Sequence, residues 1–272
     1  MSLPIVFVCG ATGTQGGALA HHLLEQDVEV HTITRDLNSV SAQNLQQRGV
    51  HITEGNFDDE EIMKKSMANC TTLFLNLTPN HSIPTGELEQ AKRLISIAKQ
   101  VAVKHIIYTS TVVSRDPERL RYWNPDSYLG MSILLKQSIE NEVRDSGFDA
   151  WTILRPGNFM SNFLNPLVKL LYHNFVETGN LVTAFTNETI IPMIDPNDIG
   201  KFAAAAALDQ AKFNNKEIEI VSQMMTLEEV MRDLSLATGK VKQATFLSEE
   251  EVEKLALLDP MVQVQRAMRD MS

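Results

Sequence analysis

The sequence predicts an α/β protein built on a doubly wound parallel sheet, with a smaller C-terminal α/β lobe. Three observations support this fold class. An apolar run at residues 5–9 leads directly into a glycine-rich loop and then into a helical segment. Strand-like and helix-like segments then alternate over the first 155 residues. The helical patterns between the strands reach ten or more residues, which is the length of crossover that joins parallel strands.

The glycine loop, G-A-T-G-T-Q-G at residues 10–16, is the clearest functional signal. Gly10 allows a sharp turn, Gly13 a close backbone approach to phosphates, and Gly16 close packing of the following helix, residues 17–25. A strand, a glycine loop and a helix N-terminus in this order present backbone N–H groups to a pyrophosphate. Glycine triplets also occur in ordinary turns, but the flanking periodicity favours a dinucleotide site.

The next predicted strand, residues 28–34, ends beside Arg35. NAD-selective sites usually place Asp or Glu near this position, whereas a guanidinium suits a 2′-phosphate. Arg35 therefore favours NADP(H) over NAD(H). Two alternatives stay open, because the Asp36 carboxylate could face the ribose and reverse the preference, or Arg35 could be a solvated charge at a loop end.

The remaining elements follow in order. Strands are expected at residues 50–54, 72–77, 105–110 and 151–154, and helices at 40–48, 58–67, 87–101 and 127–145. Later strands at 190–194 and 217–221 flank an Ala-rich helix at 200–208, and capping residues Thr226 and Ser248 start two further helices. We expect residues 1–155 to form an NAD(P)-binding Rossmann domain. Residues 156–272 should form a smaller substrate or partner lobe, with residues 190–221 returning to the main sheet.

Composition excludes several functions. The net charge of −10 and the absence of a basic cluster disfavour direct binding of nucleic acid. No apolar run approaches the roughly 20 residues of a membrane helix, and the N-terminus lacks a signal-peptide pattern. With only Cys9 and Cys70, no disulfide framework is implied, which favours a cytoplasmic location with the nucleus as an alternative. The chain has no H-x-x-x-H or C-x-x-C spacing, so we predict no metal site.

Several motifs in order carry a resemblance to a known family. They are the glycine loop, Thr-Arg-Asp at 34–36, Gly-Asn-Phe-Asp-Asp at 55–59, Lys136, and Leu-Arg-Pro-Gly-Asn-Phe-Met at 154–160. With them the chain resembles, over nearly its whole length, the NmrA-like family of atypical short-chain dehydrogenases.

The resemblance implies a set of cofactor-binding residues. The pyrophosphate would be held by Gly10, Thr12, Gly13, Gln15 and Gly16, and the 2′-phosphate by Arg35. Asn56 and Phe57 would flank the adenine, although many relatives carry Asp where Asn56 stands. Leu77, Thr78 and Pro79 would pass beneath the nicotinamide-side ribose, Lys136 would reach the cofactor, and Pro156, Asn158 and Phe159 would lie beside the nicotinamide. A Pro-Gly turn that simply ends a strand is the alternative for the last group.

The catalytic machinery is the open question. The main dehydrogenase family uses Tyr-x-x-x-Lys on one helical face, where the tyrosine is the general acid. Here Lys136 is preceded four residues earlier by Ser132, and Tyr128 lies a further turn away, about 12 Å from Lys136 along the axis. A serine hydroxyl is too weak an acid to replace a phenol. Lys136 and Ser110 are the candidate catalytic residues, each with a purely structural alternative as a solvated lysine or a strand-end serine.

Two functions of different classes remain. The favoured one is an NADP(H)-binding protein that senses the cofactor or its redox state for a regulatory protein partner. The alternative is an NADPH-dependent reductase of a small apolar ketone, quinone or enone. The loop at 114–124, with Tyr122 and Trp123, would then help form an apolar pocket with Phe163, Leu164, Leu167, Leu170, Leu171 and Phe175. Core packing explains these last residues equally well.

Overall fold

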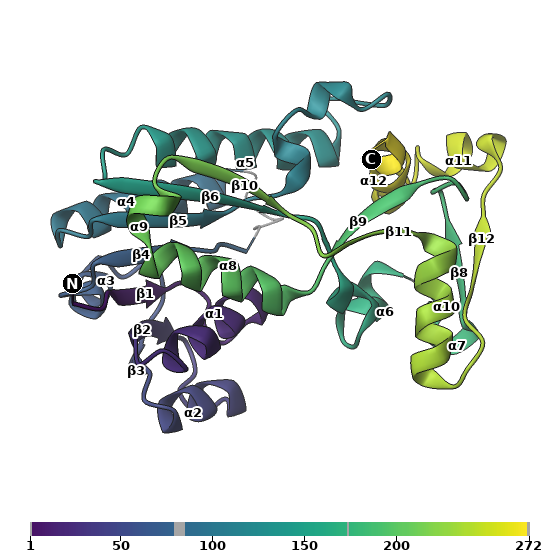
Figure 1. Cartoon of the computed structure of the whole chain (residues 1–272). Coiled ribbons are helices and arrows are strands. Elements are labelled where there is room, and N and C mark those ends of the chain that lie inside the picture. The colour runs from purple at the N-terminus through teal and green to yellow at the C-terminus, as the bar shows by residue number, and fades with distance from the viewer. Residues whose placement is uncertain (1, 79–84, 173, 271–272) are drawn as a thin grey trace. The chain divides into compact units, whose positions relative to one another are not determined.

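The computed structural model describes residues 2–78, 85–172 and 174–270. It confirms the predicted fold class, because a large seven-stranded sheet lies between helices (Figure 1). Its strands are β1 (Ile5–Val8), β2 (Glu29–Thr34), β3 (His51–Glu54), β4 (Thr72–Leu75), β5 (His105–Thr109), β6 (Ala150–Pro156) and β10 (Lys216–Ile220). They lie in the order β10-β6-β5-β4-β1-β2-β3.

The order of the strands fixes where a ligand would bind. All the pairings from β3 across to β6 are parallel. From β1 the chain winds outward to β3, then returns to β4 and winds outward in the other direction, so the winding reverses between β1 and β4. Ligands of open parallel sheets bind at such a switch point, outside the carboxyl ends of the strands. The glycine loop directly follows β1 and therefore lies at this point.

Helices cover the large sheet. They are α1 (Thr14–Leu24), α2 (Val40–Gln47), α3 (Glu60–Met67), α4 (Gly86–Gln100), α5 (Tyr128–Arg144), α8 (Pro196–Leu208) and the short α9 (Gln210–Phe213). Met63, Leu94 and Ile139, from α3, α4 and α5, are fully buried in one core with Phe7 and Ile106 of the sheet. Helices α1 and α8 pack closely, since a Cβ on Gly200 would lie only 2.6 Å from the carbonyl carbon of Ala18. Within the described ranges, no helix is both long and apolar enough to cross a membrane.

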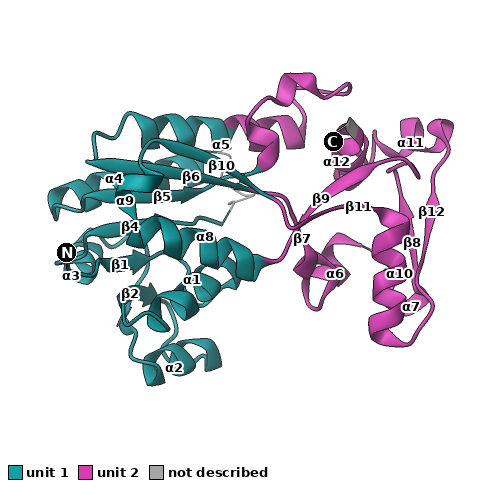
Figure 2. Ribbon diagram, in the orientation of Figure 1, with its two compact units in different colours: residues 1–111, 135–155, 196–220 teal, residues 112–134, 156–195, 221–272 magenta. Residues whose placement is uncertain are grey.

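The chain divides into two compact units (Figure 2). Unit 1 consists of residues 1–111, 135–155 and 196–220, and unit 2 of residues 112–134, 156–195 and 221–272. Unit 1 contains the seven-stranded sheet. Each unit is assembled from segments that are separate in the sequence.

Unit 2 contains two small sheets and its own apolar core. The sheets have the orders β11-β9-β7 and β12-β8, formed by β7 (Asn158–Phe159), β8 (Asn180–Thr183), β9 (Ile190–Ile194), β11 (Gln223–Thr226) and β12 (Gln243–Phe246). The helices are α6 (Leu167–Leu171), α7 (Phe175–Thr178), α10 (Leu227–Thr238), α11 (Glu249–Leu255) and α12 (Pro260–Ala267). The segment at 190–221, expected to return to the main sheet, contains two strands. Strand β10 joins the large sheet, whereas β9 pairs with β7 and β11 in a small one. An apolar pattern predicts a strand but not the sheet that it joins.

Candidate functional site

The glycine loop forms a tight backbone cradle at the N-terminus of α1. Gly10 has a positive φ of 68°, and its carbonyl accepts a hydrogen bond from the Gly13 amide at 2.9 Å. A Cβ on Gly16 would lie 2.3 Å from the Gly10 carbonyl oxygen, so no side chain fits there without a backbone shift. Gly13 is the N-cap of α1 and has no side chain with which to cap the first amides. The positive end of the helix is therefore open to an anion.

Gln15 links this loop to two neighbouring strands of unit 1. Its amide nitrogen donates a hydrogen bond to Asn76 Oδ1 at 3.1 Å, and its amide oxygen accepts one from the Thr109 hydroxyl at 2.6 Å. Asn76 follows β4 and Thr109 ends β5, so the network fixes the start of α1 to the carboxyl edge of the sheet. Sequence reasoning identified Gln15 but missed Asn76 and Thr109. The signal for Asn76 was a polar residue inside the apolar run at 72–77.

Arg35 and Asp36 at the end of β2 differ in their surroundings. The Asp36 carboxylate accepts a hydrogen bond from the Asn38 backbone amide at 2.8 Å, which holds it in a turn that leads into α2. Arg35 is exposed, and within the described part of the chain its guanidinium makes no ion pair or hydrogen bond. The turn thus engages one oxygen of the Asp36 carboxylate and leaves the Arg35 cation available at the carboxyl end of β2.

The residues expected around the adenine and ribose follow β3 and β4. Asn56 is exposed, and its side-chain oxygen accepts a hydrogen bond from the Asp58 amide at 2.7 Å, whereas Phe57 is half-buried against the large core. Leu77 is buried and Thr78 is exposed. Pro79 lies outside the described residues.

Lys136 is part of a buried charged cluster in unit 1. Its Nζ lies 2.5 Å from Oε1 of Glu87 at the start of α4, and the two side chains are only 14% and 1% exposed. The same ammonium lies 5.9 Å from the centre of the Tyr108 ring on β5. Burial raises the pKa of Tyr108 well above its usual value, the Glu87 and Glu140 carboxylates raise it further, and the Ser110 side chain acts in the opposite direction. Lys136 is therefore not an ordinary solvated helix lysine, and Glu87 and Tyr108 are site neighbours that the sequence did not suggest.

The remaining cofactor candidates belong to unit 2. Pro156 and Gly157 are buried, and a Cβ on Gly157 would lie 2.3 Å from the Pro192 carbonyl oxygen. Asn158 and Phe159 form β7, which pairs in parallel with β9. The Asn158 amide donates to the Met193 sulfur at 3.5 Å. Backbone packing within unit 2 thus accounts for the glycine in this motif.

The six residues proposed to line an apolar pocket have different environments. Phe163 and Phe175 are buried in the core of unit 2, Leu167 and Leu171 are half-buried, and Leu164 and Leu170 are exposed at the surface. This distribution favours core packing for the two phenylalanines. In the loop at 112–127, the Tyr122 ring lies 4.1 Å beneath the Arg266 guanidinium of α12.

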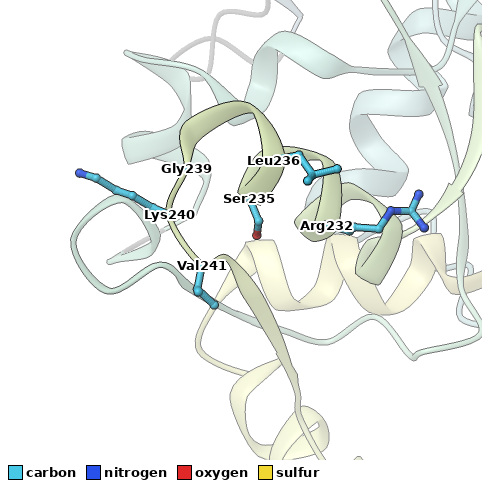
Figure 3. A pocket seen from close by; sticks show the side chains of 6 residues that line it. All are labelled: Arg232, Ser235, Leu236, Gly239, Lys240 and Val241. Atoms are coloured by element: carbon cyan, nitrogen blue, oxygen red, sulfur yellow. The ribbon is translucent and has the colours of Figure 1, made fainter.

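A shallow hollow of about 540 Å³ lies at the C-terminal end of α10 in unit 2 (Figure 3). It is lined by Arg232, Ser235, Leu236, Gly239, Lys240 and Val241. The Ser235 hydroxyl already donates to the Met231 carbonyl and accepts from the Lys242 amide at 2.8 Å. The side chains that line the hollow are therefore exposed apolar and cationic groups and a serine hydroxyl that is already hydrogen-bonded.

The chain is similar to known proteins in both sequence and fold. The NmrA-like family model matches residues 4–272. An NmrA-like family domain-containing oxidoreductase, lnaB of Aspergillus flavus, is 26% identical over 254 residues, which cover 86% of this chain and 73% of that protein.

Two solved structures share the fold. Triphenylmethane reductase of Citrobacter sp., complexed with NADP(H), has a TM-score of 0.73 at 23% identity, with coverage of 98% of this chain and 89% of that chain. NmrA, a negative transcriptional regulator, in complex with NADP has a TM-score of 0.74 at 19% identity, with coverage of 99% and 82%. A structure of the same regulator holds NAD. The family model spans nearly the whole sequence, and this chain belongs to the NmrA-like family.

Proposed function

We propose that this chain binds NADP(H) and reduces a small unsaturated acceptor, such as a quinone or an enone. The observation that carries the binding is the loop cradle, in which Gly10 has a positive φ, Gly16 leaves no room for a side chain, and Gln15 is held by Asn76 and Thr109. Such a cradle fits a pyrophosphate at a helix N-terminus. The relatives whose structures hold NAD or NADP support the same class of ligand.

The preference for NADP(H) rests on Arg35. A guanidinium binds a phosphate through two parallel hydrogen bonds, and Arg35 makes no competing contact within the described residues. The Asp36 carboxylate, which would favour a free ribose hydroxyl, is instead bonded to the Asn38 amide. By resemblance, Asn56, Phe57, Leu77 and Thr78 are the further residues of unit 1 proposed to contact the dinucleotide.

The residues at the positions expected for a catalytic acid define the class of acceptor. When bound, the reduced nicotinamide supplies a hydride. Ser132 stands where a catalytic tyrosine would be expected, and Tyr108, the phenol beside Lys136, is fully buried and cannot reach a substrate. An acceptor that spreads the resulting negative charge, and then takes a proton from water, needs no acid from the protein. Quinones and enones meet this requirement better than simple ketones. The similarity to lnaB, which is named as an oxidoreductase, supports the proposal.

Cofactor sensing is the second candidate, and the Lys136–Glu87 pair favours it. An ammonium neutralised by a buried carboxylate is a weaker electrostatic partner for a reacting carbonyl. The sequence favoured this role, and the fold shared with the regulator NmrA is compatible with it. A sensor would bind NADP(H) but would not turn it over in the absence of a partner.

One experiment separates the two candidates. Purified chain is first titrated with NADPH and NADH by calorimetry. It is then incubated with NADPH and a panel of quinones and enones while the absorbance of the reduced nicotinamide is followed. Turnover in the wild type that falls at least about tenfold in Lys136→Met, in a preparation that circular dichroism shows to be folded, but not in the surface control Lys92→Met, supports the reductase. NADPH binding with no turnover across the panel supports the sensor, and failure to bind either dinucleotide overturns both.

A further inference from the structure

Three side chains of types that can bind a metal ion lie close together at the amino ends of β2 and β3. Glu29 is the first residue of β2 and His51 the first of β3. His31 and His51 are direct partners in the register of these parallel strands, and Glu29 shares a face of β2 with His31 because side chains alternate along a strand. The glycine loop follows the carboxyl end of β1, so this cluster lies at the opposite end of the sheet from the proposed dinucleotide site.

The two imidazoles converge on one carboxylate. Oε1 of Glu29 lies 2.7 Å from His31 Nε2 and 3.7 Å from His51 Nε2. The ring centres are 4.8 Å apart, and one possible ligand atom from each residue lies within 4.8 Å of the other two. Tetrahedral ligands about 2.1 Å from a zinc ion are separated by about 3.4 Å. Small rotations of the more exposed Glu29 and His51 side chains would reach that spacing.

His31 is arranged as metal-bound histidines usually are. Its Nδ1 lies 3.1 Å from the Ser66 carbonyl oxygen of α3, which can only accept a hydrogen bond. Its Nε2 faces the Glu29 carboxylate, which is also an acceptor when ionised. A neutral imidazole has one N–H and satisfies only one of these two contacts. A protonated ring would donate to both acceptors. Donation from Nδ1 to the backbone carbonyl, with Nε2 on a metal ion, also satisfies both contacts and fixes the ring as in metal-bound histidines.

We propose that Glu29, His31 and His51 form a binding site for a divalent transition metal of the Zn²⁺ class. Two imidazole nitrogens and one carboxylate oxygen are a donor set that zinc accepts, with water in the remaining position, and that Mg²⁺ and Ca²⁺ do not favour. The ion would tie β3, the edge strand of the sheet, to β2.

A second histidine cluster has a guanidinium beside it and serves as a control. His21, His22 and Glu25 also lie within reach of one another at the end of α1. However, the Arg48 guanidinium lies 2.7 Å from His21 Nδ1 and places a positive charge beside the cluster. His22 Nε2 is bonded to Asn197 Oδ1 at 2.8 Å. The His22 contact resembles that of His31, so the positive charge of Arg48 beside His21 is what distinguishes this cluster.

The test is a calorimetric titration of metal-free, tag-free chain with ZnCl₂, repeated with MgCl₂ and with CoCl₂ as a spectroscopic probe. We expect one Zn²⁺ per chain, visible absorption typical of tetrahedral Co²⁺, a higher melting temperature with Zn²⁺, and no binding of Mg²⁺. His51→Ala and Glu29→Gln should each weaken Zn²⁺ binding at least about tenfold, whereas His21→Ala should retain wild-type affinity.

Several results would overturn the proposal. They are no Zn²⁺ binding by folded wild type, unchanged affinity in folded His51→Ala, and a loss in His21→Ala as large as that in His51→Ala. His51 is largely exposed, so its removal should preserve the fold, which circular dichroism checks. The second variant, Glu29→Gln, tests the same site if His51→Ala is poorly folded.

Discussion

Glu87 and Lys136 stand 49 residues apart in the sequence, yet they form a buried ion pair between α4 and α5 beside Tyr108. The pair is asymmetric, because the carboxylate is almost completely buried and the ammonium keeps some access to solvent. Removing one partner of a buried pair leaves the other charge without compensation, which is costly. Leaving the more deeply buried Glu87 carboxylate unpaired should therefore cost more stability than leaving the Lys136 ammonium unpaired.

We therefore predict that Lys136→Met destabilises the fold more than Glu87→Gln does. Lys136→Met should lower the free energy of unfolding by about 3–5 kcal/mol, and the Glu87→Gln/Lys136→Met double variant should recover most of that loss. Urea denaturation of the four proteins in a double-mutant cycle measures the coupling. Additive effects of the two single changes would show that the pair contributes no interaction energy.

Arg35 should control the choice of dinucleotide. Arg35→Gln removes a charge-assisted contact to the 2′-phosphate and should weaken NADPH binding about 10- to 100-fold, with NADH affinity unchanged. Calorimetry with both cofactors measures the two affinities. Asp36→Asn is the matched control, and because the Asp36 carboxylate is bonded within its turn, neither affinity should change by more than about twofold. Equal losses for NADPH and NADH in Arg35→Gln would contradict this role.

Gly16→Ala should abolish dinucleotide binding in a chain that still folds. The new Cβ would lie 2.3 Å from the Gly10 carbonyl oxygen, so the loop backbone must shift away from its phosphate-binding form. We expect NADPH affinity to fall by about 100-fold or more. Gly49→Ala is the control, because Gly49 has a φ of 92° but no atom within 4 Å of the added Cβ. Its strain should cost about 1–3 kcal/mol of stability and leave binding intact.

Local patterns predicted much of the fold, and contacts between distant segments account for most of what was missed. Thr226 and Ser248 begin helices with complete capping boxes, and the strand at 190–194 has the expected bounds, because caps and apolar runs are local signals. The parallel pair β8–β12 was missed, since residues 184–242 separate its two short strands in the sequence, as the register of Leu181 with Ala244 illustrates.

The same limit applies to the candidate site. The glycine loop was predictable because its residues are adjacent, whereas the contacts of Gln15 with Asn76 and Thr109 span 61 and 94 residues. The prediction of no metal site, which used ligand spacing along the chain, stays a prediction. Such spacing does not reveal the pairing of His31 with His51 across two strands.

His105 gives the fold a defined dependence on pH. The His105 side chain is fully buried. The Thr152 hydroxyl donates its proton to the Phe213 carbonyl at 2.9 Å. Thr152 Oγ1 therefore accepts a hydrogen bond from the His105 Nε2–H at 3.0 Å. His105 Nδ1 is buried without a hydrogen-bond partner among the described residues. Burial lowers the pKa of His105 from 6.5 to about 4. Between these two values the unfolded chain binds the extra proton and the folded chain does not, so stability falls as the pH decreases.

We predict that His105→Gln removes this part of the acid sensitivity. Glutamine can donate its amide N–H to Thr152, as the imidazole does, but it does not titrate. Between pH 7 and pH 4.5 the wild type should lose about 2 kcal/mol more of its free energy of unfolding than the variant does. Urea denaturation of both proteins at both pH values gives four free energies of unfolding. Subtracting the loss in the variant from the loss in the wild type removes the contribution of the other titrating groups. Parallel losses in the two proteins would mean that His105 titrates normally in the folded state.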